Sequence, residues 1–217
     1  MEIGIIGSGK IGGTLGKHWA KAGHEVMFSS RNPEMLQHMV EAIGAQVGNV
    51  QATARFGEII LLAVPFGVIP DLLSKIGTLD NKILIDATNP YPQRDGEVAQ
   101  QVIDDATQTA TGYVASQFSG AKTVKAFNSI YFKVLEDQAF RSGDDRIAVQ
   151  IASDDTAAKK TVARLIEEIG FAPQDIGSLK DGPIFEPGAL LYNQNLKIGD
   201  AEDKLNRLKA QPRKNEQ

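Results

Sequence analysis

Residues 7–12 read Gly-Ser-Gly-Lys-Ile-Gly and match G-x-G-x-x-G, a pattern that binds the pyrophosphate of dinucleotides when it joins a strand to a helix. Here the pattern follows an apolar run at residues 2–6 directly. The first glycine permits the tight turn, the second lets the backbone approach the pyrophosphate, and the third lets the helix pack on the strand. Free N–H groups at the helix start then face the anion. The predicted phosphate-binding residues are Gly7, Ser8, Gly9, Lys10, Ile11 and Gly12.

The residues after the next apolar run indicate which dinucleotide binds. In NAD-binding proteins an acidic residue ends this second strand and bonds the ribose 2′-hydroxyl. Residues 28–32 read Phe-Ser-Ser-Arg-Asn, so the first carboxylate comes only at Glu34. A guanidinium pairs with a phosphate through two hydrogen bonds, and serine hydroxyls add donors, although either serine is also typical of an ordinary strand end. We therefore predict NADP(H) rather than NAD(H), with Ser29, Ser30 and Arg31 at the 2′-phosphate.

Three further strand ends carry small or polar residues that suit the ribose and the nicotinamide. Ligands of open α/β sheets bind outside the carboxyl ends of the strands. Each asparagine amide at such an end offers donors and an acceptor to a carboxamide or to the edge of a planar ring. Asparagine also caps turns, so each has a structural alternative. The predicted residues of this half are Ala63, Val64, Pro65, Asn89 and Asn128.

Groups that usually donate protons to a substrate are sparse. No tyrosine is followed four residues later by lysine, which excludes the proton donor of short-chain dehydrogenases. The histidines, His18, His24 and His38, lie in the first two βα units, so neither a histidine acid nor a metal site is expected. Two roles stay open for Asp86: a catalytic base, or a cap of the turn that follows its strand. Two roles also stay open for Tyr91: a platform for a ring of the cofactor or acceptor, or an ordinary half-buried aromatic residue of the loop. We leave the catalytic residues unassigned. A flavin or deazaflavin acceptor suits a site with few proton donors, because it accepts hydride on its own ring.

Alternating strands and helices must position these residues. Nearly continuous Ile, Leu, Val and Ala predict buried strands at residues 2–6, 25–29, 58–64, 82–86, 123–128 and 146–152, with a shorter one at 45–47. Helices are expected at residues 10–22, 33–43, 67–76, 97–118 (with Gly112 as a possible break), 155–169 and 189–196. This order predicts an α/β fold, a Rossmann-like doubly wound, mostly parallel sheet with a small C-terminal helical portion.

Composition narrows the classes of protein further. The chain has 217 residues, no cysteine and a net charge of −4. Disulfides, thiolate metal sites and cysteine nucleophiles are therefore excluded, and general nucleic-acid binding is disfavoured because it needs a basic surface. No apolar run reaches the roughly 18 residues that span a membrane, and the first residues do not resemble a signal peptide. We expect a cytoplasmic protein.

These motifs, with the segments Asn-Pro-Tyr-Pro at 89–92 and Lys-Ala-Phe-Asn at 125–128, resemble the NADPH-dependent reductases of the deazaflavin coenzyme F-420 and the broader group of small NADP oxidoreductases. The resemblance covers about residues 1–195. It implies a Rossmann domain, expected at 1–180, and a small segment at 181–217 that helps to close the acceptor cleft and ends in a polar tail. It also implies hydride transfer between NADP(H) and a deazaflavin, commonly in a homodimer. By matching motifs, the implied cofactor residues are Ser30 and Arg31 at the 2′-phosphate and Ala63, Val64 and Asn89 beside the nicotinamide.

One departure from the family affects the choice of nucleotide. The family can carry a further basic residue after Arg31, whereas Asn32, Pro33 and Glu34 offer none.

The sequence does not fix the hydride acceptor, so three functions stay open. The first function is hydride transfer from NADPH to a deazaflavin or flavin-like acceptor. The second is reduction of a small imine or carbonyl, with Tyr91 or Asp86 donating the proton. The third is a non-catalytic NADPH-binding sensor.

Replacing Arg31 tests the nucleotide assignment. Arg31→Ala is expected to weaken NADPH binding far more than NADH binding, because only NADPH carries the 2′-phosphate that a guanidinium pairs with. Titration of each nucleotide against wild type and variant measures both losses. Equal losses would contradict the placement of Arg31 at the 2′-phosphate.

Overall fold

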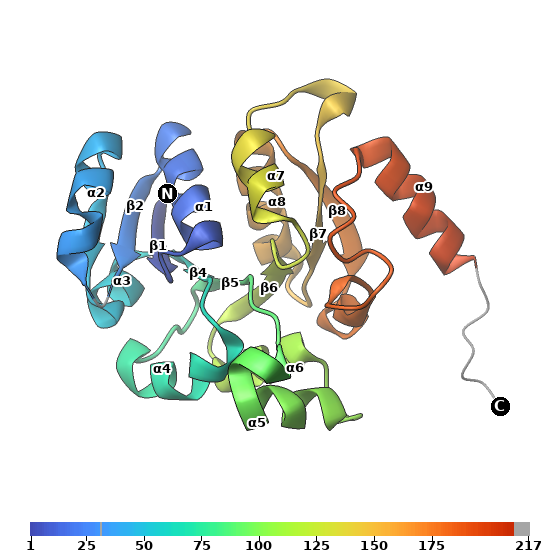
Figure 1. Cartoon of the computed structure of the whole chain (residues 1–217), viewed down its shortest axis with the longest axis horizontal. Coiled ribbons are helices and arrows are strands. Elements are labelled where there is room, and N and C mark those ends of the chain that lie inside the picture. The colour runs from blue at the N-terminus through green and yellow to red at the C-terminus, as the bar shows by residue number, and fades with distance from the viewer. Residues whose placement is uncertain (31, 211–217) are drawn as a thin grey trace.

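The computed structural model describes residues 1–30 and 32–210, and in these residues eight strands form one sheet in the order β3-β2-β1-β4-β5-β6-β7-β8 (Figure 1). Neighbouring strands run parallel except β6 and β7, which are antiparallel. The α/β Rossmann-like fold predicted from the sequence is confirmed. The strands are β1 (Glu2–Ile6), β2 (Glu25–Ser29), β3 (Gln46–Gly48), β4 (Ile59–Leu62), β5 (Ile83–Asp86), β6 (Lys122–Ala126), β7 (Ala148–Ala152) and β8 (Ala172–Gly177).

The central strands are apolar throughout because helices cover both faces of the sheet. Alternate residues of one strand therefore enter different cores. In β4, Ile59 and Leu61 join one hydrophobic cluster, whereas Ile60 and Leu62 join the other. The first cluster includes Trp19, whose buried indole N–H donates to the carbonyl of Leu165 at 3.1 Å.

The helices divide between the two faces in agreement with these clusters. Helices α1, α2, α7 and α8 contribute to the first cluster, and α3, α4, α5 and α6 contribute to the second. Figure 1 shows α7 and α8 on one side of the sheet and α4, α5 and α6 on the other. The helices are α1 (Lys10–Lys21), α2 (Gln37–Ile43), α3 (Val50–Phe56), α4 (Ile69–Ile76), α5 (Pro92–Asp104), α6 (Ala110–Gln117), α7 (Phe132–Asp137), α8 (Thr156–Glu168) and α9 (Ile198–Lys209), with 3-10 turns η1 (Pro33–Leu36), η2 (Phe66–Val68), η3 (Gly143–Asp145) and η4 (Leu179–Phe185).

The last part of the chain packs beside the far edge of the sheet. Phe185, Leu191 and Leu205 form a third cluster with Ile176 of β8. This cluster anchors η4, the loop that follows it, and α9. Helix α9 lies at the outer edge of the molecule (Figure 1).

One helix prediction placed its break wrongly, and another was wrong. The segment 97–118 is two helices, but the break falls at residues 105–109 and Gly112 lies inside α6. Thr109 begins α6, since its hydroxyl accepts a hydrogen bond from the Gly112 N–H at 2.9 Å. Residues 189–196 form turns rather than a helix, and the helical C-terminal portion is α9.

Two helices and one strand were missed, namely α3, α7 and β8. Helix α3 is short, and its N-cap residue Asn49, which accepts from the Ala52 N–H at 2.8 Å, was the available signal. Strand β8 contains Pro173 and Asp175 and lacks an apolar run, because it is an edge strand with one pairing partner. No helix in the described part of the chain is both long and apolar enough to cross a membrane.

Candidate functional site

The glycine turn joins β1 to α1, as predicted. Gly7 has φ +105°, and a Cβ there would collide with the carbonyl group of Ala63. A Cβ on Gly12 would collide with the carbonyl oxygen of Gly7. A Cβ on Gly9, by contrast, would meet nothing within 4 Å. Two of these glycines are therefore required by packing, while the third leaves open space in front of the turn.

The N-terminus of α1 is open to an anion. Gly9 occupies the N-cap position, no side chain caps the helix, and the first turn contains no acidic residue. The first N–H groups of a helix have no partner within the helix, and the helix dipole favours negative charge at this end. The turn has the features of a phosphate-binding site.

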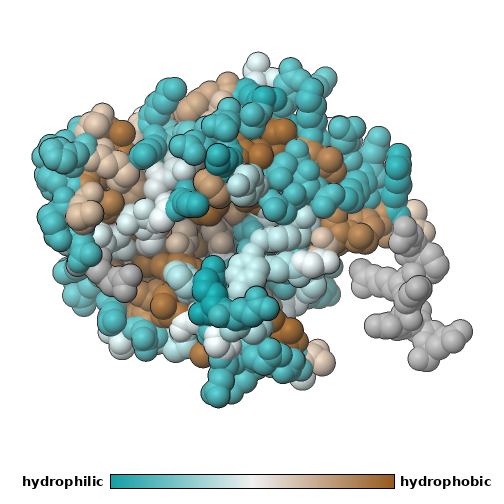
Figure 2. All heavy atoms as spheres, viewed as in Figure 1, coloured by the Kyte–Doolittle hydropathy of each residue, from teal (hydrophilic) through white to brown (hydrophobic). Residues whose placement is uncertain are grey.

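Two adjoining cavities lie at the carboxyl ends of the strands. A cavity of about 540 Å³ lies in front of the glycine turn. A second, of about 350 Å³, lies next to it over the ends of β5 and β6. Both are lined by Ala63, Val64 and Pro65, which follow β4. In the face shown in Figure 2, hydrophobic residues are visible between hydrophilic ones near the middle of the molecule.

The first cavity, which we call the nucleotide cavity, brings together residues predicted from three strand ends. Ser30 lies beside the turn, and its hydroxyl oxygen accepts the Asn32 N–H at 3.0 Å. Arg31 lies outside the described residues. Sequence reasoning missed the opposite wall, because α3, η2 and α4 carry no nucleotide motif. The predicted lining residues are Gly7, Ser8, Gly9, Ser29, Ser30, Ala63, Val64 and Pro65. The missed residues of the opposite wall are Val50, Val68, Asp71, Leu72 and Lys75.

The second cavity, which we call the ring cavity, has polar groups on its floor and aromatic side chains around it. It is lined by the predicted residues Lys10, Ile11, Asn89 and Asn128. Tyr91 also lines it, which favours the ring-platform alternative over a plain loop aromatic. The aromatic residues missed from the sequence come from the loop after β6 and from the C-terminal part: Phe127, Tyr131, Phe132 and Tyr192.

Asn89 and Asn128 bind each other. The Asn89 side-chain amide donates to the Asn128 backbone carbonyl at 2.8 Å, and the Asn128 amide donates to Asn89 Oδ1 at 3.2 Å. The Asn128 amide also donates to the carbonyl of Phe185 at 3.0 Å. The oxygen Oδ1 of Asn128 is buried without a hydrogen-bond partner. Such an atom costs free energy unless a ligand or water donates to it, and a carboxamide NH₂ is a suitable donor.

Asp86 performs the turn-capping role that was one of its two alternatives. Its Oδ1 accepts both the N–H and the hydroxyl of Thr88, at 2.9 and 2.6 Å. Its Oδ2 lies 3.0 Å from Nζ of Lys125, and both side chains are fully buried. Asp86 does not line either cavity. An acid–base role for it is therefore disfavoured, and Lys125 is a buried charge that sequence reasoning did not use.

The hydroxyl groups of Tyr91 and Tyr192 share a hydrogen bond at the ring cavity, although 101 residues separate them. Burial and the bond with Tyr91 raise the pKa of Tyr192 above its ordinary value, so it stays protonated at neutral pH. Arg94 lies over the Tyr91 ring, 4.8 Å from its centroid, and donates to the Asn89 carbonyl at 3.0 Å. The C-terminal part thus contributes a wall to this cavity.

Residues 2–90 match the model of a protein family described as NADP oxidoreductase, coenzyme F420-dependent. This range contains the glycine turn and all predicted site residues except Asn128. The match confirms the family resemblance seen in the sequence motifs. The description of this family agrees with the predictions of an NADP-dependent oxidoreductase and of NADP(H) as its cofactor.

Two metalloreductases are similar in sequence to most of the chain. It is 32% identical over 180 residues to metalloreductase STEAP3 of Rattus norvegicus, and 28% identical over 197 residues to metalloreductase STEAP2 of Mus musculus. These alignments cover 82% and 86% of this chain but 34% and 35% of the relatives. The chain therefore spans about a third of the length of these curated relatives.

Solved structures share the fold. A hypothetical protein from Sinorhizobium meliloti is 28% identical with a TM-score of 0.77, over 91% of this chain and 95% of that one. A protein from Arthrobacter described as an F420-dependent NADP reductase is 25% identical with a TM-score of 0.71, over 84% and 87%. An imine reductase from Myxococcus stipitatus in complex with NADP⁺ is 14% identical with a TM-score of 0.62, over 96% and 61%, and shows the fold alone.

The glycines of the turn make separate predictions. Gly9→Ala is expected to fold as wild type but to weaken NADPH binding by roughly tenfold, because its Cβ enters the open space that we predict for the pyrophosphate. Gly12→Ala is expected to lower the unfolding temperature, because its Cβ collides with backbone. Gly199→Ala, a helical site with open space, is the control. Unchanged NADPH affinity in folded Gly9→Ala would contradict a pyrophosphate at this turn.

Glu186 predicts a pH-dependent stability difference. Burial raises its pKa; the charge of Lys125 lowers it and that of Asp86 raises it, with a net upward shift. Since the folded pKa exceeds the unfolded one, ionisation above about pH 4.3 costs the folded state stability. Glu186→Gln is therefore expected to be more stable than wild type at pH 7 and equally stable near pH 4.

Urea unfolding at the two pH values measures this difference. Glu202→Gln, an exposed carboxylate on α9, is the control and is expected to change stability at neither pH. A Glu186→Gln variant whose stability difference from wild type is the same at both pH values would contradict a raised pKa.

Proposed function

We propose that this protein binds NADPH across the nucleotide and ring cavities and transfers its hydride to a deazaflavin or flavin-like acceptor. The observation that carries the proposal is that Ala63, Val64 and Pro65 line both cavities. One cavity has the phosphate-binding turn, and the other has aromatic walls and convergent amides. The description of the matching family as coenzyme F420-dependent supports the choice of acceptor.

In the nucleotide cavity, the pyrophosphate would lie at the N-terminus of α1. Ser29, Ser30 and Arg31 would bind the 2′-phosphate, as the sequence predicts. The apolar side chains of Val50, Val68 and Leu72 line the same cavity and offer a surface for adenine. These residues would fix the cofactor and leave its reactive ring to the neighbouring cavity.

In the ring cavity, the nicotinamide would pass over the backbone at residues 63–65 and present its carboxamide to Asn89 and Asn128. The unpaired Oδ1 of Asn128 fits that group, because the carboxamide NH₂ would satisfy it. When bound, NADPH supplies a hydride, that is, a proton together with two electrons. The chain's own contribution is to hold the two rings in contact and to exclude water.

The acceptor ring would lie between the nicotinamide and the aromatic side chains of the ring cavity. Among the described lining residues, Lys10 and Arg94 are cationic and none is a carboxylate. Tyr192 and Asn193 come from the segment 181–217. We therefore propose that this segment closes the acceptor cleft, and that residues 1–180 form the dinucleotide-binding domain. A homodimer and a cytoplasmic location stay predictions.

Reduction of a small imine or carbonyl is the second candidate, and the Tyr91–Tyr192 pair favours it. Hydride would add to the substrate carbon, and a tyrosine hydroxyl would donate the proton to nitrogen or oxygen and recover it from solvent. The pKa of Tyr192 is raised, so it holds that proton at neutral pH. A deazaflavin or flavin acceptor does not need this donor.

Anaerobic mixing with NADPH and a panel of acceptors tests the proposal. Loss of reduced-nicotinamide absorbance is expected with the deazaflavin, FMN or FAD, and not with simple imines or ketones. The variant carrying Tyr91→Phe and Tyr192→Phe is expected to keep most of this turnover, because both rings remain. Turnover of an imine that this variant abolishes would establish the second candidate. NADPH binding without turnover of any acceptor would favour the sensor function.

A further inference from the structure

We propose that the buried ion pair of Asp86 and Lys125 is a positioning device for the reaction site: it holds the backbone at Thr88 and so fixes the place of Asn89 and Asn128, which line the ring cavity. The inference rests on the proposed function, since it gives the ion pair a role in presenting the nicotinamide.

The ion pair is unusual for its burial. Asp86 ends β5 and Lys125 lies near the end of β6, two neighbouring parallel strands. Nζ and Oδ2 are 3.0 Å apart, and neither side chain is exposed to solvent. Among the ion pairs of the described residues, no other has both side chains fully buried. Burying two charges costs desolvation energy that their attraction often does not repay, so stability alone is a weak reason for this pair.

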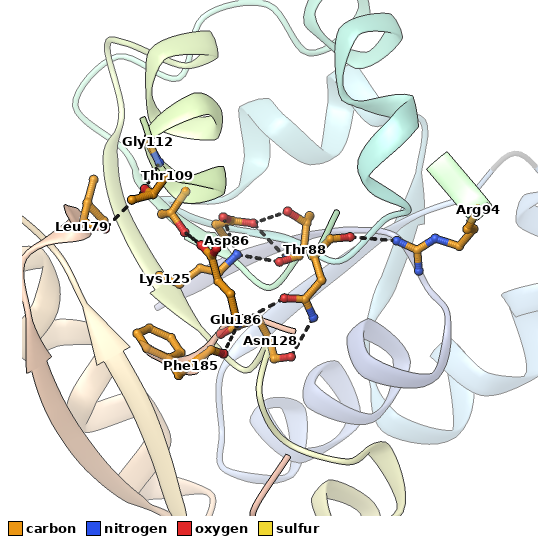
Figure 3. A network of polar contacts seen from close by, with 12 residues as sticks. Asp86, Thr88, Arg94, Thr109, Gly112, Lys125, Asn128, Leu179, Phe185 and Glu186 are labelled. Atoms are coloured by element: carbon orange, nitrogen blue, oxygen red, sulfur yellow. Dashed lines mark hydrogen bonds and ion pairs between the residues drawn. The ribbon is translucent and has the colours of Figure 1, made fainter. Parts of the chain in front are cut away.

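The pair fixes three atoms of a single residue. Asp86 Oδ1 accepts the N–H of Thr88 at 2.9 Å and its hydroxyl at 2.6 Å. Lys125 Nζ donates to the Thr88 carbonyl oxygen at 2.5 Å. Figure 3 shows the three side chains converging. The backbone at Thr88 therefore has its donor, its acceptor and its side chain all bound, which leaves it little freedom to rotate.

This restraint passes directly to the amides of the ring cavity. Asn89 follows Thr88 in the chain, and its side chain binds Asn128, which comes three residues after Lys125. Asn128 continues the network to the carbonyl of Phe185 in η4 (Figure 3). Thr88, Asn89 and Asn128 all line the ring cavity, while Asp86 and Lys125 do not. The charges thus act through the residues that would touch the cofactor, as positioning residues.

A charge-neutral double variant separates positioning from stability. Asp86→Asn with Lys125→Met removes both charges at similar side-chain size, so no uncompensated charge stays buried. It also removes the donor to the Thr88 carbonyl while keeping an acceptor for the Thr88 N–H. The matched control is Lys159→Met with Asp175→Asn, a pair at 2.8 Å that lines neither cavity.

The affinities for two ligands then measure the two halves of the site separately. Adenosine 2′,5′-bisphosphate lacks the nicotinamide, and both double variants are expected to bind it as wild type does. NADPH is expected to bind the Asp86/Lys125 variant about tenfold more weakly, without the rise in nicotinamide fluorescence that we expect on its binding to wild type. The unfolding temperature is expected to stay within a few degrees of wild type.

The outcomes distinguish this inference from the proposed function. If the Asp86/Lys125 variant keeps wild-type NADPH affinity and fluorescence, or does not fold, the pair is structural and the inference is overturned. If the variant loses affinity for both ligands equally, the ion pair maintains both cavities and not the ring cavity in particular, and the inference also fails. If wild type binds neither ligand, the proposed function itself is wrong.

Discussion

The backbone of Gly7 lies directly against the backbone of Ala63, and this contact places the two halves of the site together. The Ala63 N–H donates to the carbonyl of Ile6 at 2.9 Å, so the ends of β1 and β4 are hydrogen-bonded up to the turn. A Cβ at Gly7 would collide with Ala63, so only glycine permits this approach. Because the ends of β1 and β4 are joined, the phosphate-binding turn and residues 63–65 border one space. The nucleotide cavity and the ring cavity adjoin for this reason.

The remainder of the site follows from the parallel arrangement of β1, β4, β5 and β6. Parallel neighbours end at the same edge of the sheet. Asn89 and Asn128 therefore lie together at the floor of the ring cavity, although they are 39 residues apart. The antiparallel pairing of β6 with β7 then turns the chain back. It allows η4 and the following loop to return to the site, with the Phe185 carbonyl bound to Asn128 and Tyr192 bound to Tyr91. The ring cavity is therefore built from both ends of the chain.

Sequence reasoning succeeded where local pattern and physical role coincide. Continuous apolar runs mark the central strands because both faces are buried. The glycine spacing marks the turn because Gly7 and Gly12 have no room for a Cβ and Gly9 leaves the space in front of the turn open. It failed where the signal depends on a distant partner. Strand β8 has Pro173 and Asp175 and is defined by its pairing with β7. Lys125 looks like an ordinary strand lysine until Asp86 is placed 3.0 Å away. No local pattern indicates that Tyr192 meets Tyr91.

A crystal structure of the protein with NADP⁺ would show whether the two cavities form one dinucleotide site. We expect the pyrophosphate at the N-terminus of α1 and the nicotinamide over residues 63–65. We also expect the carboxamide within hydrogen-bonding distance of Asn128 Oδ1. A nicotinamide outside the ring cavity, with Asn128 Oδ1 still without a partner, would contradict the account.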